Sequence, residues 1–234
     1  MSREFMHRQF DTDIEMLRSS VTTMAGLVER QFVRAVDAVR LRDPDLVAQV
    51  LADEQRVNQL HVETDLRCNR TIARRQPIAI DLREIIAVIH TINDLERIGD
   101  EAKKIARKAR AIDLAGTPMP TERIERMAAL VRGMLSAAID AFMRHDARTA
   151  AQLVQRDDEV DALRDELIAD LMATMTARPE TVSPGLALIF IVQSLERIGD
   201  HATNIAEYVV NLVEGIDLRY ATSGGGGASP PVAS

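Results

Sequence analysis

Apolar residues recur at spacings of three and four along most of the chain, which is the period of an amphipathic α-helix. Proline, glycine and clusters of polar residues interrupt this pattern and divide the chain into helical segments. We predict helices at about residues 10–40, 45–75, 81–112, 121–144, 146–176 and 186–214. The sequence therefore predicts an all-α protein built from long helices.

The breaks between these segments contain the residues that end or begin helices. Pro44 suits the first turn of a helix, because the N–H that proline lacks has no partner there. Pro77 stops the second predicted helix, and the stretch 116–120 separates the third from the fourth. The stretch 179–185 is predicted to separate the fifth helix from the sixth. Every predicted connection is short, so neighbouring helices should run antiparallel.

The chain is an internal repeat. The hexapeptide Leu-Glu-Arg-Ile-Gly-Asp occurs at 95–100 and again at 195–200. A shift of 103 residues lays Leu27 on Leu130, and by the third helix the shift is 100, so one loop is shorter in the second half. Length differences in loops are expected of a duplicated domain. We predict two tandem homologous three-helix bundles.

The predicted bundles have up-down topology and are similar to spectrin repeats. The first covers residues 1–116 and the second covers 117–220. The tail 221–234 contains four consecutive glycines and two prolines, so it has no means of burying itself and is predicted to be disordered.

Composition and charge exclude several classes of function. The net charge of −7 argues against a nucleic-acid partner, because such binding uses clustered lysine and arginine. The single cysteine, Cys68, cannot form an internal disulfide, and residues 1–13 contain no apolar run that resembles a signal peptide. The longest apolar run, 186–192, is far shorter than the roughly 20 residues that span a bilayer. We predict a cytoplasmic protein that meets the membrane only through partners.

The repeated hexapeptide places two carboxylates on one helical patch. Glu96 and Asp100 are four residues apart, as are Glu196 and Asp200, so the members of each pair lie one above the other. Like charges at this spacing cost a helix roughly 0.2–0.5 kcal/mol, and the glycine between them costs up to about 1 kcal/mol more. By helical-wheel angle, these carboxylates should face outward or into a groove rather than into the core.

The second helix of each half carries a matching pair. The shift of 103 lays Glu54 and Asn58 on Asp157 and Asp161, again four residues apart. Four oxygen-bearing side chains from two neighbouring helices form the kind of cluster that binds a hard or borderline cation. We therefore predict a metal site in each half. Oxygen ligands favour iron, manganese, magnesium or calcium over zinc.

Other interpretations of these residues remain open. Acidic pairs are often solvated and neutralised by neighbouring basic residues, and Asp100 could pair with Lys104 in this way. The equivalent partner of Asp200 is Asn204, so this explanation does not transfer between the halves. His201 is either an additional ligand of the second site or an exposed helical histidine.

The whole chain up to about residue 220 resembles the PhoU family of phosphate-transport regulators. The resemblance is carried by the paired Glu-Arg-Ile-Gly-Asp motifs on the third helices and by the acidic pairs on the second helices. It implies metal clusters on the bundle surfaces. The implied ligands are Glu54, Glu96 and Asp100 in the first half, with Asn58 departing from the acidic pattern, and Asp157, Asp161, Glu196 and Asp200 in the second.

The resemblance also implies a regulatory function without catalysis. Members of the family act in the cytoplasm as dimers, restrain the high-affinity phosphate ABC transporter, and link its state to a sensor histidine kinase. The implied partners are therefore the ATP-binding subunit of that transporter and the kinase. The residues alone leave two alternatives, a carboxylate-bridged di-metal enzyme and a metal-free helical scaffold. Di-iron bundles place a histidine three residues after a glutamate, where this chain has Gly99 and Gly199.

Overall fold

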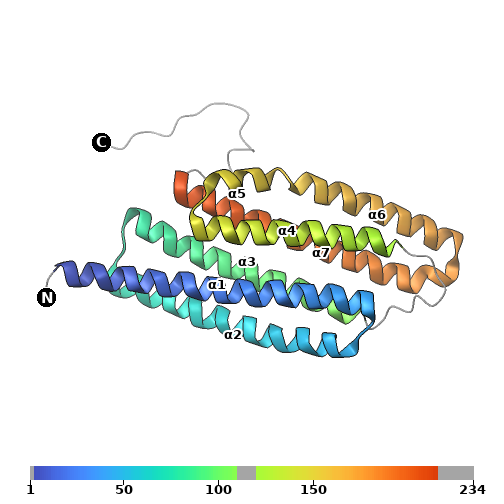
Figure 1. The fold of residues 1–234 in the computed structure, drawn as a ribbon, viewed down its shortest axis with the longest axis horizontal. Coiled ribbons are helices and arrows are strands. Elements are labelled where there is room, and N and C mark those ends of the chain that lie inside the picture. Colours follow the sequence, from blue (N-terminus) through green and yellow to red (C-terminus); the bar gives the residue numbers. More distant parts are fainter. Residues whose placement is uncertain (1–2, 110–119, 216–234) are drawn as a thin grey trace.

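The computed structural model describes residues 3–109 and 120–215, and within these ranges the chain forms seven α-helices and one short 3₁₀ helix (Figure 1). The helices are α1 (Arg3–Leu41), α2 (Pro44–Arg75), α3 (Ala79–Ala109), α4 (Thr121–Arg144), α5 (Ala147–Val154), α6 (Asp157–Ala177) and α7 (Val182–Glu214), with the 3₁₀ helix η1 (Pro179–Thr181) before α7. The all-α prediction is confirmed.

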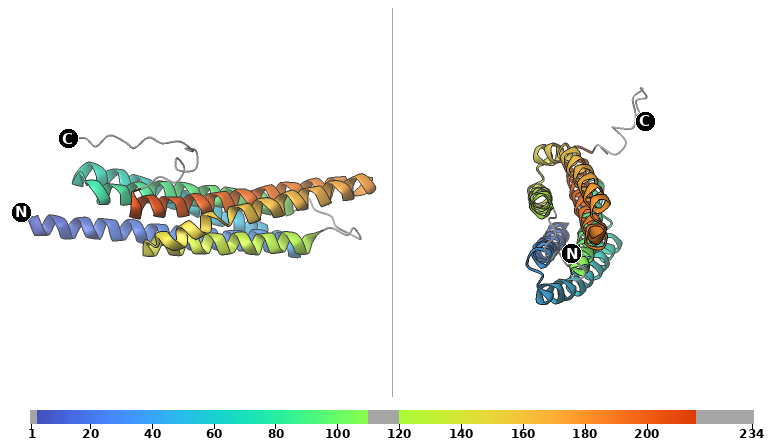
Figure 2. Two further views of the ribbon diagram at one scale, coloured as in Figure 1. Left: turned by 90° about the horizontal axis from the view of Figure 1, so that it is seen from above. Right: turned by 90° about the vertical axis from the view of Figure 1, so that its right-hand side faces the viewer.

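The helices form two bundles that lie side by side (Figures 1 and 2). Helices α1, α2 and α3 pack on one another, and α4 packs with α5, α6 and α7. The two bundles meet where α3 packs along α7 and, to a smaller extent, where α1 packs against α4. The predicted boundary at residues 116/117 and the predicted tail 221–234 lie outside the described residues.

Helices α3 and α7 run antiparallel. His90 of α3 stacks on Tyr208 of α7, with 5.0 Å between the ring centroids. Towards the other end of α3, Lys108 lies 4.3 Å from the ring centroid of Phe190. Residue numbers therefore rise along one helix as they fall along the other, which relates the two halves by an approximate two-fold axis.

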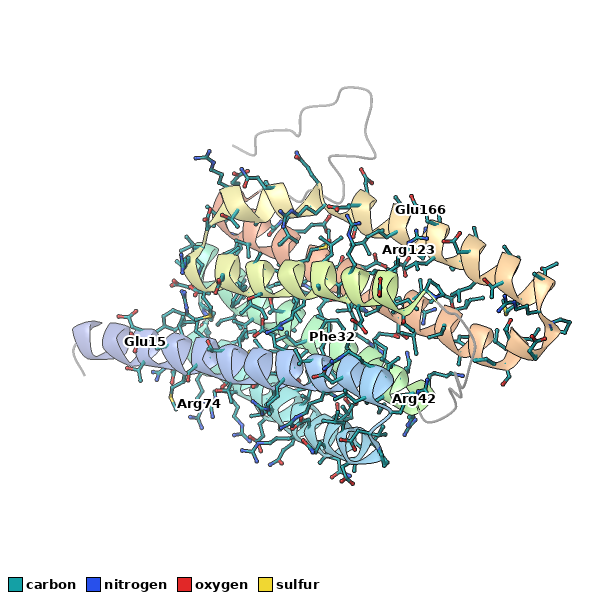
Figure 3. All side chains as sticks on the ribbon, turned by 45° about the vertical axis from the view of Figure 1, so that its right-hand side comes forward. Glu15, Phe32, Arg42, Arg74, Arg123 and Glu166 are labelled. Carbon is teal, nitrogen blue, oxygen red and sulfur yellow. The ribbon has the colours of Figure 1, made fainter. Side chains whose placement is uncertain are left out.

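The interior is aliphatic, as the scarcity of aromatic residues requires. Phe32 of α1 and Phe142 of α4 are each 1% exposed and are surrounded by leucine, isoleucine, valine, alanine and methionine. Charged side chains line the outside, where Arg123 of α4 reaches across to Glu166 of α6 at 2.7 Å (Figure 3). Burial of the apolar stripes is what holds such long helices together, because helix propensity alone is weak.

The fifth helix differs from its prediction, because it is interrupted. The chain turns at residues 155–156, where the N–H of Arg156 donates to the carbonyl of Leu153 at 2.9 Å instead of continuing the helical ladder. Three acidic residues follow, and they occupy the first turn of α6. Negative charge is stabilised at the positive end of a helix dipole, so this run favours a new helix start. Asp157 therefore lies in the first turn of α6 rather than in the middle of a helix.

The sixth helix begins earlier than predicted. Helix α7 starts at Val182, so Pro184 and Gly185 lie in its first turn instead of in a loop. Proline is accommodated there because the first turn needs no N–H donor. Gly185 is buried against Met175, whose Cγ would lie 2.7 Å from a β-carbon at that position. Helix α1 also begins earlier, at Arg3, and residues 110–112 of the predicted third helix lie outside the described ranges.

One described stretch, Pro179–Glu214, is long and apolar enough to cross a membrane by length and composition. Within its most apolar window, 56% of the residues are buried inside the protein. That burial is typical of the core helix of a soluble protein. The stretch lies between α4, α6 and α3 in the packed structure.

Candidate metal centre

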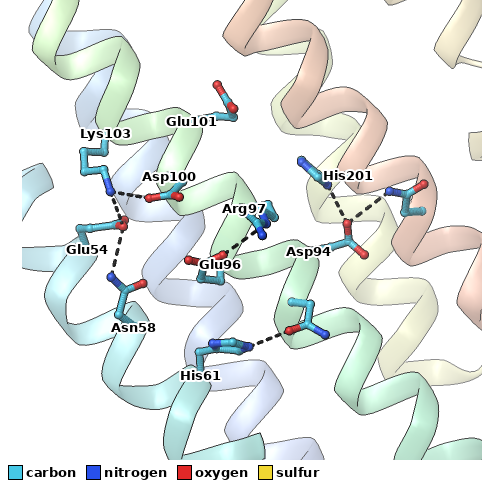
Figure 4. A network of polar contacts seen from close by, with 12 residues as sticks. Glu54, Asn58, His61, Asp94, Glu96, Arg97, Asp100, Glu101, Lys103 and His201 are labelled. Atoms are coloured by element: carbon cyan, nitrogen blue, oxygen red, sulfur yellow. Dashed lines mark hydrogen bonds and ion pairs between the residues drawn. The ribbon is translucent and has the colours of Figure 1, made fainter.

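The first acidic cluster lies where α2 faces α3, and all four predicted residues of the first half are found there (Figure 4). Glu54 is only 4% exposed, whereas Glu96 and Asp100 are partly exposed. The burial of Glu54 is possible because three donors reach it: Gln31 Nε2 at 2.9 Å from Oε2, Lys103 Nζ at 2.9 Å from Oε1, and Asn58 Nδ2 at 3.4 Å from Oε1.

Lys103 is the central cation of this cluster. Its ammonium joins Glu54 of α2 to Asp100 of α3, so one positive charge bridges the two helices. Burial alone would raise the pKa of Asp100, but the hydrogen bond from Lys103 holds it below the ordinary value of an aspartate. The same two carboxylates raise the pKa of Lys103. Asp100 and Lys103 therefore stabilise the charged forms of each other.

The remaining residues of the first cluster have weaker partners. Glu96 is partly buried and lies 3.7 Å from Arg97, its neighbour in the sequence. The alternative pairing of Asp100 with Lys104 does not form, because Lys103 takes that position and Lys104 pairs with Glu101 at 2.7 Å.

The second cluster lies where α6 faces α7 and has a different set of partners. Arg164 of α6 contacts Asp161 at 2.8 Å and Glu196 of α7 at 2.5 Å. Asp157 accepts one hydrogen bond, from Thr203 Oγ1 at 3.2 Å. Within residues 3–109 and 120–215, no side chain donates a hydrogen bond to Asp200 or forms an ion pair with it.

The carboxylates of the second cluster repel one another. Burial is the main cause that raises the pKa of Asp200 to about 6, and the charges of Glu196, Asp157 and Asp161 raise it further. Burial also raises the pKa of Asp157 against the lowering effect of its hydrogen bond from Thr203, and the charges of Asp161, Asp158 and Glu196 raise it further. Four carboxylates with a single arginine are therefore poorly neutralised, which is the electrostatic condition that a bound cation relieves.

The glycines of the two motifs meet different surroundings. A β-carbon on Gly99 would lie 3.0 Å from Gln31 Oε1 and 3.2 Å from Glu54 Oε2. A β-carbon on Gly199 would meet only valine methyl groups, the nearest being that of Val160 at 3.5 Å. Glycine at position 99 therefore lets Gln31 and Glu54 lie close to the backbone of α3, whereas position 199 could hold a β-carbon without a close contact.

As the side chains stand, no three carboxylate, imidazole or thiol groups in the described part of the chain are arranged to hold a metal ion. In the second cluster the reason is visible, because Arg164 holds Asp161 and Glu196 while Thr203 holds Asp157. The type and number of donors suit a hard cation, which would have to displace these partners in order to bind.

Comparison with known proteins identifies the duplicated unit. The PhoU domain matches this chain twice, at residues 21–109 and at residues 124–209. The chain belongs to the PhoU family.

Full-length relatives support this assignment. The chain is 41% identical over 214 residues to the phosphate-specific transport system accessory protein PhoU homolog of Pseudomonas putida, covering 91% of this chain and 84% of the relative. The crystal structure of PhoU from Pseudomonas aeruginosa superimposes with a TM-score of 0.85 at 40% identity, covering 88% of this chain and all of that one. The phosphate transport system regulatory protein PhoU from Streptococcus pneumoniae gives a TM-score of 0.83 at 27% identity, covering 89% and 98%.

The two halves of this PhoU-family chain are joined by a polar contact that the sequence did not reveal. Asp94 of α3 is 6% exposed and lies 2.6 Å from His201 Nδ1 and 3.2 Å from Asn204 Nδ2, both on α7 (Figure 4). His201 is therefore a partly buried residue of the interface between the halves, and the expectation of an exposed histidine is wrong. Beside it, Arg197 lies 3.6 Å from Glu101 of α3.

Four residues of the PhoU clusters were missed by sequence reasoning: Gln31, Lys103, Arg164 and Thr203. A signal for two of them is present in the repeat. The shift of 103 lays Gln31 on Met134, and the shift of 100 lays Lys103 on Thr203. Glutamine where the other half has a core methionine, and lysine where it has threonine, mark the half in which the carboxylates have internal partners.

Proposed function

We propose that this protein is a regulatory accessory protein of phosphate-specific transport, which restrains high-affinity phosphate uptake and the phosphate-starvation response. The observation that carries the proposal is the match of both halves to the PhoU domain, together with relatives of that name over 91% of the chain. The proposed role is that of a cytoplasmic, dimeric helical adaptor and not of an enzyme. Gly99 and Gly199 supply no ligands where di-iron bundles have histidines, and a ferroxidase assay with added iron is expected to show no turnover.

The proposed partners are the ATP-binding subunit of the phosphate ABC transporter and the phosphate-sensing histidine kinase. Exposed apolar side chains on the helical surface support binding to proteins. Ile78, just before α3, and Ile80, in its first turn, are 77% and 57% exposed. Large apolar side chains exposed next to one another are a feature of interaction sites.

Recovery of bound proteins from cells tests the proposed partners. The tagged protein would be isolated from cells grown with and without phosphate, and the bound proteins identified by mass spectrometry. We expect the transporter subunit and the kinase to be enriched over a tag-only control, and enrichment of one or both to fall in the variant Ile78→Ser plus Ile80→Ser. Consistent recovery of neither protein from the wild type would refute the proposal.

We also propose that the second acidic cluster binds a divalent or transition metal ion, with iron, manganese or magnesium favoured over zinc. Four carboxylates with one arginine provide the oxygen donors that such ions prefer, and Asp200 has no internal partner in the described structure. The residues that would hold the ion are Asp157 and Asp161 of α6 with Glu196 and Asp200 of α7. An ion shared between these helices would fix their relative position and so the outer surface that they offer to partners.

Metal analysis of two matched variants tests this second proposal. Glu196→Ala plus Asp200→Ala removes two carboxylates from the cluster, whereas Glu125→Ala plus Glu180→Ala removes two exposed carboxylates outside it. After dialysis against Mn²⁺ and then against buffer, we expect the first variant to lose bound metal and the second to retain the content of the wild type. Equal metal content in all three proteins would refute the assignment.

A further inference from the structure

We infer that Lys103 takes the place of a metal ion in the first half of the chain, so that only the second half is open to metal. The inference deepens the proposed metal site and rests on it. It concerns the functional difference between two clusters that descend from one duplicated motif.

The geometry of the first cluster carries the inference. The ammonium of Lys103 lies between Glu54 of α2 and Asp100 of α3, which is where an ion bridging the two helices would have its ligands. Glu54 also accepts hydrogen bonds from Gln31 and Asn58, so each of its oxygens already has a donor. A metal ion would have to displace a lysine and would still face the N–H groups of two amides.

The second cluster lacks each of these donors at the matching position. Thr203 stands where the first half has Lys103, Met134 stands where it has Gln31, and Asp161 stands where it has Asn58. Arg164 neutralises Asp161 and Glu196, but no lysine or arginine in the described ranges forms an ion pair with Asp157 or Asp200. These two residues are the counterparts of Glu54 and Asp100.

Charge balance leads to the same conclusion. The first cluster contains three carboxylates. Lys103 bridges two of them, and Arg97 lies beside the third. The second cluster contains four carboxylates and one cation, Arg164, which contacts two of them. A lysine ammonium and a small metal ion compete for the same position between two carboxylates, because each supplies the positive charge that the pair requires.

The decisive experiment opens the first cluster while the second is disabled. Lys103→Thr copies the residue of the second half, and it would be introduced into the variant Glu196→Ala plus Asp200→Ala. Bound Mn²⁺ would be measured by elemental analysis, and the melting temperature would be recorded in chelator and in Mn²⁺. We expect Lys103→Thr to restore metal binding in this background, with melting at higher temperature in Mn²⁺, since a ligand of the native state stabilises it. Adding Glu54→Gln should abolish the restored binding.

The reciprocal variant provides a second, independent test. Thr203→Lys places an ammonium in the second cluster, and we expect it to lower the metal content of the otherwise unchanged protein. If Lys103→Thr failed to fold, this variant alone would decide, and unchanged metal content would overturn the inference.

Several outcomes separate the inference from the proposed metal site. The inference is overturned if a folded Lys103→Thr protein takes up no metal in the disabled background. It is also overturned if the disabled background still binds metal and loses it on Glu54→Gln. A wild type without metal, together with a Lys103→Thr variant that binds it, would refute the proposed site in the second half and support the role of Lys103.

Discussion

The two motif glycines give opposite predictions for the same substitution. Alanine is favoured over glycine in a helix interior by about 0.8–1.0 kcal/mol. At Gly199 the added methyl group meets valine side chains at 3.5 Å or more, which is ordinary contact. Gly199→Ala should therefore raise the free energy of unfolding by about 0.5–1 kcal/mol.

At Gly99 the same methyl group meets polar atoms that are held in place. It would lie 3.0 Å from Gln31 Oε1 and 3.2 Å from Glu54 Oε2, and Glu54 is fixed by Lys103 and Asn58. Overpacking of a buried position costs about 1–3 kcal/mol, and a weakened hydrogen bond to a charged group adds up to about 1.5–3 kcal/mol. These costs exceed the gain in helix propensity, so Gly99→Ala should lower the free energy of unfolding by about 1–3 kcal/mol.

Urea unfolding in chelator measures both variants without interference from metal. The midpoints should move in opposite directions relative to the wild type, at similar slope. A third protein, Gly99→Ala with Gln31→Ala, tests the cause, because removing the glutamine makes room for the methyl group. The penalty of Gly99→Ala should be smaller in that background than in the wild type. Equal stabilisation by alanine at both glycines would refute the assignment of a tight polar network to the first half alone.

Three further predictions concern groups away from the carboxylate clusters. Burial raises the pKa of the Cys68 thiol to about 12, so a disulfide reagent at pH 8 should label it only after unfolding, and rapid labelling of the native protein would contradict its burial. Hydrogen bonds from Thr149 hold the pKa of Asp146 below its ordinary value at the start of α5. Its ionised form therefore stabilises the protein above the pKa of an unfolded aspartate, so the melting temperature lost on Asp146→Ala should shrink as the pH falls through the folded pKa. Asp94→Ala removes the acceptor of His201 and Asn204 between the halves and should cost about 1–3 kcal/mol in urea unfolding, and a change within error would refute its role there.

The sequence alone predicted the elements, which depend on apolar periodicity, and their duplication, which the repeated hexapeptide reveals. The second helix shows why: Pro44 fixes its first turn, Gln76 ends it with a left-handed backbone at φ 50°, and both lie within a residue of the predicted limits. The break at residues 155–156 was not predicted, since Leu153 and Val160 on either side of the polar run 155–159 are seven residues apart and would share one face of an unbroken helix. There the acidic run at the start of α6 outweighed the continuity of the helix.

The candidate site was predicted in position but not in detail. The spacing of the carboxylates placed Glu54 beside Asp100, and the structure brings them together through Lys103. Which cation neutralises them could not be read from periodicity, because Lys103 and Lys104 both follow the motif and only the packing of α2 decides which one reaches it. Gln31 comes from α1, so its contribution depends on the arrangement of three helices. Such contacts are fixed by tertiary packing, which a local pattern does not encode.

The antiparallel contact of α3 with α7 contains a polar contact that depends on the two halves being different. Under the approximate two-fold axis, the counterpart of His201 is Glu101, and the counterpart of Asp94 is Ser194. Two copies of the first half would therefore set Asp94 against a glutamate, and two copies of the second would set serine against histidine. Only the mixed arrangement gives the carboxylate an imidazole partner. This contact therefore favours the pairing of a first half with a second half over the pairing of two identical halves.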